Sequence, residues 1–251
     1  MKPAPFDYLR PASLGEALEA LASDGAMALA GGQSLIAMLN MRLARPDLLV
    51  DIVHLPELRG RGLRVGAAVR QAELAGLHPL IDRALPHVGH YQTRSRSTFC
   101  GSVAHADPAA ELPLCVVALG GRVHLASARG ERTVEAAAFF EGPLMTAREE
   151  DELIAAVELP PPDPRAGYAF REVALRHGDF ALAAFAAVAD ADGVRLAVGG
   201  VADTPVVLDG LAIDPDAIDA RDDFHADAAY RRRLVDRVGR ATVEEALACR
   251  A

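Results

Sequence analysis

Short apolar runs separated by polar turns dominate the first fifty residues. Two runs of strand length begin at Ala26 and Leu48. Between them, apolar residues at helical spacing follow Ser34, which predicts a helix that crosses from one strand to the next, so the strands should be parallel. A capping box that starts at Ser13 predicts an earlier amphipathic helix. The pattern predicts a small α/β unit over residues 1–55.

Strand-like and helix-like periods are mixed over residues 56–163. The pattern predicts strands, a β-hairpin and three helices, the last of them a buried helix that begins at Pro108. The predicted elements are a strand over 63–69, a helix from Gln71, a helix over 79–90, the buried helix to residue 119, a hairpin of 122–126 with 132–134, and a strand over 154–159. The proline-rich segment 160–164 has neither the strand-like nor the helix-like spacing of apolar residues, so it is predicted to be a linker and domain boundary.

Beyond the proline run, three long strand-like segments follow one another. A turn joins the last two, which predicts a three-stranded antiparallel sheet. Two helical segments come next, and the apolar residues of the first are spaced to cover one face of this sheet. The predicted strands are 168–176, 181–189 and 194–201, and the predicted helices are 225–238 and 243–248. Together they predict a compact α+β domain over residues 164–251.

Composition and charge limit the partners of the chain. The 251 residues are 51% hydrophobic, which supports a substantial core, and they carry a formal net charge of −9. An acidic chain whose longest basic run is Arg231–Arg233 is not expected to bind nucleic acid or an acidic membrane surface. The sequence has no run of eighteen apolar residues and no apolar signal segment, so we expect no membrane insertion and a cytoplasmic location.

The cysteines and histidines argue against a metal centre in this chain. Cys100, Cys115 and Cys249 are too few and too far apart for an iron–sulfur cluster or a disulfide framework. His105 and Asp107 are one histidine and one carboxylate, which is a weak basis for metal ligation. Any redox centre in this chain is therefore expected to be organic, and metal centres are expected on other polypeptides.

Two glycine-bearing loops are the candidate ligand-binding segments. The sequence AGGQSL (Ala30–Leu35) follows a predicted strand and precedes a predicted helix, which lets backbone N–H groups approach a phosphate closely. The sequence TFCGS (Thr98–Ser102) offers a glycine and two hydroxyls ahead of the buried helix. The first loop alone is better explained as an ordinary turn. Together the two loops indicate a ligand with two phosphates or one long dinucleotide.

Five segments together resemble those of one protein family. They are AGGQSL, TFCGSVAHADPAAELP, FFEG (Phe139–Gly142), ELIAAVELP (Glu152–Pro160) and FREVALRHGDFAL (Phe170–Leu182), in the family's order and spacing over nearly the whole chain. The chain thereby resembles the FAD-binding medium subunits of the molybdenum hydroxylases, which include carbon monoxide dehydrogenase, quinoline oxidoreductase and xanthine dehydrogenase. The resemblance implies an α+β fold, with a two-part FAD-binding domain of the PCMH, vanillyl-alcohol-oxidase-like type and a small α+β C-terminal domain.

The resemblance also implies which residues bind FAD. The two loops would hold the pyrophosphate, Glu111 would lie near the ribose, and Arg171 would contact the flavin and raise its potential. No residue of this chain is expected to be catalytic or to bind a metal. The candidate cofactor-binding residues are Ala30, Gly31, Gly32, Gln33, Ser34, Leu35, Val88, Thr98, Cys100, Gly101, Ser102, His105, Asp107, Glu111, Ile154 and Arg171.

Several of these positions have a simpler explanation. Glu111 would also suit the first turn of any helix, Arg171 would suit a protein surface, and Val88 and Ile154 would suit an ordinary core. Cys100 departs from the family pattern, because many relatives have a glycine there. The chain is also shorter than is common in the family, mostly around residues 55–80 and at the C-terminus.

The implied function is electron transfer. FAD in this chain would collect electrons from [2Fe–2S] clusters of a small partner subunit and pass them to an external acceptor. A large partner subunit with a molybdenum cofactor would oxidise the substrate, by resemblance an N-heteroaromatic compound, in a dimer of heterotrimers. Two alternatives remain, a free-standing FAD-dependent oxidoreductase and a non-catalytic nucleotide-binding or assembly module. The acceptor stays open, although no GxGxxG sequence follows a strand, which mildly disfavours NAD.

Overall fold

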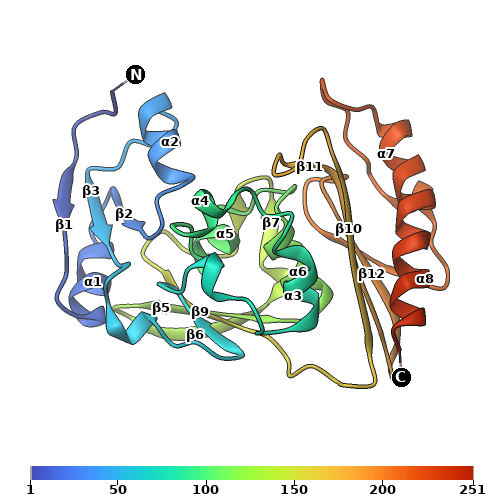
Figure 1. Ribbon diagram of the computed structural model, residues 1–251. Coiled ribbons are helices and arrows are strands. Elements are labelled where there is room, and N and C mark those ends of the chain that lie inside the picture. The colour runs from blue at the N-terminus through green and yellow to red at the C-terminus, as the bar shows by residue number, and fades with distance from the viewer. Residues whose placement is uncertain (1, 251) are drawn as a thin grey trace.

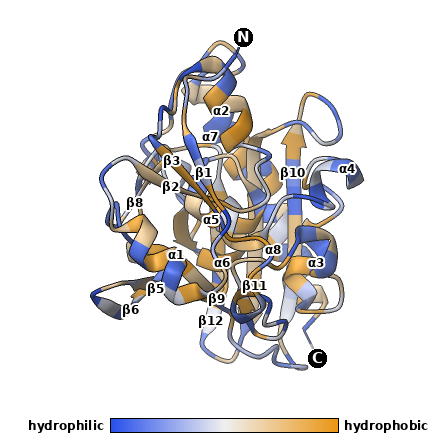
Figure 2. Ribbon diagram, turned by 90° about the vertical axis from the view of Figure 1, so that its left-hand side faces the viewer, coloured by the Kyte–Doolittle hydropathy of each residue, from blue (hydrophilic) through white to orange (hydrophobic). Residues whose placement is uncertain are grey.

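A computed structural model describes residues 2–250, which form three units that lie side by side in chain order (Figure 1). An N-terminal three-stranded sheet, a central sheet with helices above it, and a C-terminal sheet follow one another across the molecule. In Figure 2 the peripheral loops are mostly hydrophilic, whereas hydrophobic segments gather toward the middle. No helix within residues 2–250 combines the length and the apolar character that crossing a membrane requires.

The N-terminal unit is a parallel sheet with two helices. Its strands pair in the order β1-β3-β2, and both pairings are parallel, as the sequence predicted for β2 and β3. Ser13 begins the first helix, because its hydroxyl accepts a hydrogen bond from the N–H of Glu16 at 3.2 Å. The elements are β1 (Asp7–Leu9), α1 (Leu14–Leu21), β2 (Ala26–Leu29), α2 (Leu35–Met41) and β3 (Leu48–Asp51).

A four-stranded antiparallel sheet forms the floor of the central unit, and its helices lie above it (Figure 1). The strands pair in the order β4-β9-β5-β6, and β5 and β6 form the predicted hairpin. The strands are β4 (Arg64–Gly66), β5 (Arg122–Ser127), β6 (Gly130–Glu135) and β9 (Leu153–Glu158), with the small pair β7 (Phe140–Gly142) and β8 (Met145–Thr146). The helices are α3 (Pro79–Ala84), α4 (Tyr91–Arg94), α5 (Phe99–His105) and α6 (Glu111–Ala118), and short 3-10 turns lie at 56–58, 71–73 and 136–138.

The segment ahead of the buried helix differs most from the prediction. Residues 99–105 form α5, where the sequence pattern predicted a loop, and the hydroxyl of Thr98 caps this helix. The buried helix α6 begins at Glu111, so the prediction that it begins at Pro108 is wrong. The carbonyl oxygen of Pro108 instead accepts a hydrogen bond from the N–H of Gly200 at 2.7 Å. That bond ties the segment to the C-terminal sheet and keeps it out of the helix.

The C-terminal sheet has four strands, so the prediction of three strands is wrong. The fourth strand is a four-residue edge strand, which is too short to give a clear sequence pattern. The sheet is antiparallel with the order β10-β11-β12-β13. Its strands are β10 (Gly167–Ala174), β11 (Ala181–Asp190), β12 (Gly193–Gly199) and β13 (Val206–Asp209).

The two predicted C-terminal helices form one continuous helical run. The run consists of α7 (Ala228–Leu234), a π-helical turn (Val235–Gly239) and α8 (Arg240–Ala248). A Cβ atom built on Gly239 would lie 3.0 Å from Cδ2 of Leu196 on β12. The glycine therefore lets the helix lie close against the sheet and does not end it.

Both faces of the C-terminal sheet are covered, because side chains alternate between the faces along each strand. Phe185 on β11 belongs to the hydrophobic cluster beneath α7 and α8, on the outer side of the sheet (Figure 1). Its neighbours Ala184 and Ala186 belong to the central cluster on the side of α6. Groups between α6 and this sheet are therefore shielded from water.

Candidate cofactor site

The first glycine loop packs directly against the segment that leads to the second. A Cβ atom built on Gly31 would lie 2.3 Å from the carbonyl oxygen of Arg96 and 2.6 Å from Cα of Ser97, so only glycine permits this approach. Gly32 has a φ of 71°, in the left-handed region that favours glycine. The two loops that sequence reasoning paired therefore lie side by side where the N-terminal and central units meet.

The first loop carries free hydrogen-bond donors. The N–H groups of Gly32, Gln33 and Ser34 have no acceptor within residues 2–250. The hydroxyl of Ser34 makes no cap hydrogen bond at the start of α2. In the second loop, by contrast, the hydroxyl of Thr98 is engaged, since it accepts a hydrogen bond from the N–H of Gly101 at 3.1 Å. Free backbone donors beside glycines are suited to phosphate oxygens.

A cavity of about 300 Å³, the small cavity, opens at these loops. Residues of all three units line it, including Phe180 in the turn between β10 and β11. The candidate residues that line it are Gly31, Gly32, Gln33, Ser34, Val88, Thr98, Gly101, Ser102, His105, Asp107 and Glu111.

A second cavity of about 960 Å³, the large cavity, adjoins the same loops. It shares Gly31, Gly32, Ser34, Gly101 and His105 with the small cavity. An extended ligand could therefore lie across the glycine loops with one end in each cavity. The candidate residues Ala30, Leu35, Cys100 and Ile154 line the large cavity alone.

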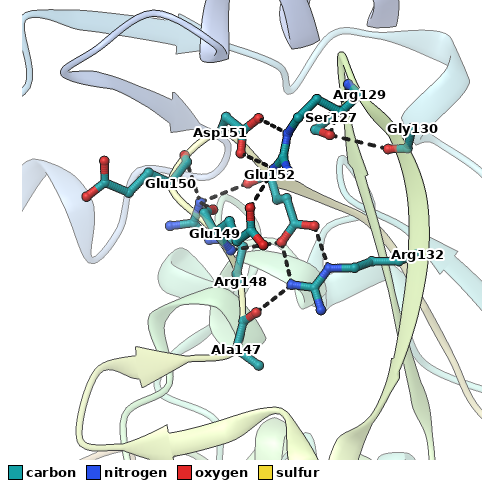
Figure 3. Close-up of polar contacts among 10 residues, drawn as sticks. All are labelled: Ser127, Arg129, Gly130, Arg132, Ala147, Arg148, Glu149, Glu150, Asp151 and Glu152. Carbon is teal, nitrogen blue, oxygen red and sulfur yellow. Dashed lines mark hydrogen bonds and ion pairs between the residues drawn. The ribbon is translucent and has the colours of Figure 1, made fainter.

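Arginines fix the segment that walls the large cavity (Figure 3). Arg148 donates through Nη1 to the carbonyl oxygens of Glu149, Glu150 and Glu152 at 2.9, 3.2 and 2.8 Å. Arg132 holds the carboxylate of Glu152 through two hydrogen bonds of 2.6 and 2.7 Å, whereas the carboxylate of Glu150 points away from the network (Figure 3). Burial lowers the pKa of Arg148. Hydrogen bonds from these two arginines therefore fix the shape of this wall.

Glu111 and His105 line the small cavity, and Glu172 lies outside its lining. Glu111 is 6% exposed, and burial, together with the charges of Glu172 and Asp107, raises its pKa to about 7. Burial also raises the pKa of Glu172, on β10, to about 7. Burial lowers the pKa of His105 against the opposing effect of Asp107, so this imidazole is mostly neutral at pH 7. The site can thus hold protons on carboxyl groups near neutral pH.

Two candidate residues have partners elsewhere in the protein. Arg171 lines neither cavity, and its guanidinium donates to the carboxylate of Glu245 on α8 at 3.0 Å. Cys100 is 2% exposed and its thiol donates to the carbonyl oxygen of Val65 at 3.4 Å. Burial raises the pKa of this thiol to about 12, so it stays protonated and packs as a small core group.

Sequence reasoning missed Gln71 as a cavity residue. Its side chain is 4% exposed, lines the small cavity, and leaves Oε1 without a partner within residues 2–250. Its N–H donates to the carbonyl oxygen of Ser97 at 2.9 Å, and its neighbour Arg70 forms a β-bridge with Thr98. The sequence gives no signal for this contact, because it joins segments far apart in the chain.

These features fit a dinucleotide cofactor. The loops at Gly31 approach each other as only glycine permits, and the N–H groups that follow are free to bind phosphate oxygens. The side-chain oxygen of Gln71 is buried and lacks the hydrogen-bond partner that such groups normally have. Two cavities that meet at these loops give room for a long ligand. The fold and the site together define a protein that binds an extended dinucleotide.

Comparison with known proteins gives the family. Residues 4–162 match the family model described as the FAD binding domain in molybdopterin dehydrogenase. The chain belongs to the FAD-binding medium subunits of the molybdenum hydroxylases. It is a flavoprotein subunit of a molybdenum-containing dehydrogenase or hydroxylase, and its cofactor is FAD.

Relatives and solved structures resemble the chain over most of its length. It is 40% identical to the caffeine dehydrogenase subunit beta of Pseudomonas sp. (strain CBB1), over 84% of this chain and 78% of the relative. It is 36% identical to the nicotine 6-hydroxylase medium subunit of Paenarthrobacter nicotinovorans, over 98% of this chain and 99% of the relative. The structure of carbon monoxide dehydrogenase from Hydrogenophaga pseudoflava matches with a TM-score of 0.91 and 30% identity over 100% of both chains. Quinoline 2-oxidoreductase from Pseudomonas putida 86 matches with a TM-score of 0.88 and 32% identity over 99% of both.

Proposed function

We propose that this chain transfers electrons within a three-subunit molybdenum hydroxylase. It takes electrons from the iron–sulfur clusters of a small subunit and passes them to an external acceptor, while a large molybdenum subunit oxidises the substrate. The substrate is an N-heteroaromatic compound, a proposal supported by the names of the caffeine and nicotine relatives. The assembly is a dimer of heterotrimers, and the chain divides into two FAD-binding subdomains, 1–55 and 56–163, and a C-terminal domain, 164–251.

The observation that carries this proposal is that both cavities meet at the two glycine loops. The free N–H groups between Gly32 and Ser34 bind the pyrophosphate there. Val88, Phe180 and the amide of Gln71 line the small cavity and would hold the flavin there. The large cavity would take the adenosine half.

Bound FAD supplies the exchange between one-electron carriers and a two-electron acceptor. The residues of this chain bind and orient it. The walls of the small cavity would restrict the access of water to it, because Glu111 of α6 and Gly178–Phe180 of the turn between β10 and β11 line that cavity.

The test is a matched pair of glycine substitutions in the purified holoenzyme. Gly31→Ala places a methyl group against backbone atoms that cannot move aside, so we expect roughly tenfold or greater weakening of FAD binding. Gly62→Ala is the control, because a Cβ there has no neighbour within 4 Å. The measurement is FAD released per heterotrimer on heat denaturation. Full FAD content in the Gly31→Ala complex would refute the proposed binding mode, and a wild-type holoenzyme without FAD or partner subunits would refute the function.

A further inference from the structure

Two buried carboxyl groups between α6 and β10 are not explained by binding the cofactor alone. Glu111 forms part of the wall of the small cavity. The side chain of Glu172 is only 4% exposed, and its Oε1 lies 3.2 Å from Nδ1 of His87. Its other oxygen, Oε2, is buried and has no hydrogen-bond partner within the part of the chain that the structure describes. A buried carboxylate oxygen without a donor is costly, so this group favours its protonated form.

No cation compensates the two carboxyl groups. Among residues 2–250, neither Glu111 nor Glu172 forms an ion pair with an arginine or a lysine, and the neighbouring Arg171 is bound to Glu245. Asp107, ahead of α6, adds a further negative charge near Glu111. The other titratable neighbour on α6 is the buried thiol of Cys115, which stays protonated because burial raises its pKa.

Histidines connect this pair with the surface. The side chain of His87 is 32% exposed, and its Nδ1 lies 3.2 Å from Oε1 of Glu172 on its inner side. Its ring centroid lies 6.5 Å from that of His177, which lies 6.2 Å from that of His90. Burial lowers the pKa of His87, so this imidazole is mostly neutral at pH 7 and can pass a proton between solvent and the carboxyl group.

We propose that Glu111, Glu172 and His87 form a proton-exchange site that takes up a proton from solvent when the FAD in the small cavity is reduced. The inference rests on the proposed function. Two electrons come from the iron–sulfur clusters of the partner subunit, and the cofactor accepts them with one proton, which leaves the cavity one charge more negative. In a poorly solvated site, that charge increases the proton affinity of the carboxyl pair.

The second proton enters through His87 and is held by the pair. When the acceptor removes the two electrons, the negative charge disappears and the proton returns to solvent by the same route. In this scheme Glu172 and His87 do not touch the cofactor. They are positioning residues that control the protonation of Glu111 at the cavity wall.

The experiment measures how many protons the holoenzyme takes up per two electrons. The midpoint potential of the FAD is followed by visible absorbance from about pH 6 to pH 8.5, a range that spans the titration of the pair. For wild type we expect between one and two protons per two electrons within this range. For Glu172→Gln, an isosteric change that removes an unpaired acid, we expect the value to fall toward one. The control is Glu244→Gln, an exposed glutamate on α8.

An infrared difference spectrum between the reduced and oxidised holoenzyme provides a second readout. Wild type should show a change in the band of protonated carboxyl groups, and this change should be lost in Glu172→Gln and in Glu111→Gln. A purely structural role of Glu172 would alter neither the proton count nor this band. If both variants behave as wild type while the FAD still titrates, the proton-exchange inference is overturned and the proposed function stands. If wild type has no FAD to titrate, the proposed function itself has failed.

Discussion

Replacing Glu111 by glutamine should stabilise the folded chain at alkaline pH and leave it unchanged at acidic pH. The pKa of this carboxyl rises from 4.5 to about 7 on folding, mainly because α6 buries it. The folded chain therefore holds the proton more tightly than the unfolded chain. Protonation favours folding in full below about pH 4.5, and this contribution is lost as the pH rises through about 7.

The size of the effect follows from the same two values. Each unit of difference between the folded and unfolded pKa values corresponds to 1.36 kcal/mol. Ionising Glu111 above about pH 8 therefore costs about 3 kcal/mol of folding free energy. A glutamine side chain at this position carries no charge at any pH and so avoids this cost. For a chain of this length, about 3 kcal/mol corresponds to a Tm difference of roughly 6–12 °C.

The assay is thermal unfolding of the full chain, followed by circular dichroism at pH values from about 5 to 8.5. The Tm of the Glu111→Gln variant should exceed that of wild type increasingly as the pH rises, whereas the exposed-site control Glu244→Gln should follow wild type throughout. A constant difference between Glu111→Gln and wild type at all pH values would refute the reasoning. It would mean that Glu111 is ionised in the folded chain or that its burial differs.

One substitution and one labelling experiment test other parts of the fold. Arg231 is 1% exposed and donates to the carbonyl oxygens of Leu182 and Gly200 and to the carboxylate of Asp223, so Arg231→Met should cost about 3–5 kcal/mol in a chemical denaturation series, and an unchanged midpoint would contradict its buried role. Iodoacetamide at about pH 8 should modify one thiol per folded chain, the exposed Cys249, because the other two cysteines are buried and keep their protons; mass analysis showing three labels on folded protein would contradict this.

Local patterns predicted much of the N-terminal and C-terminal units. The parallel pairing of β2 and β3 followed from two apolar runs with a helix between them, and the long strands of the C-terminal sheet followed from their apolar runs. The fold around α5 did not follow from such patterns. Thr98 and Gly101 look like turn residues in the sequence, yet the threonine hydroxyl caps the N–H of the glycine and so starts a helix.

The parts of the site that the sequence could not predict depend on contacts between distant segments. Gln71 reaches the small cavity only because its backbone is bonded to Ser97. Glu172 follows Arg171 in an alternating strand, which looks like a solvent-exposed polar pair. In the folded chain the two residues have different surroundings, since Arg171 donates a hydrogen bond to Glu245 on α8 and the carboxyl group of Glu172 lies against the imidazole of His87.

Gly31 links the binding of the cofactor to the packing of the units. The backbone contact at this residue holds the N-terminal unit against the central unit, and both cavities meet at the same point. A ligand that lies across this contact binds only when both units are in place, so it stabilises their arrangement by a free energy that grows with the logarithm of its affinity. A larger side chain at Gly31 would therefore act twice, by separating the two loops and by removing the ligand that holds them together. Binding of the cofactor and the mutual placement of the two units are for this reason expected to be lost together.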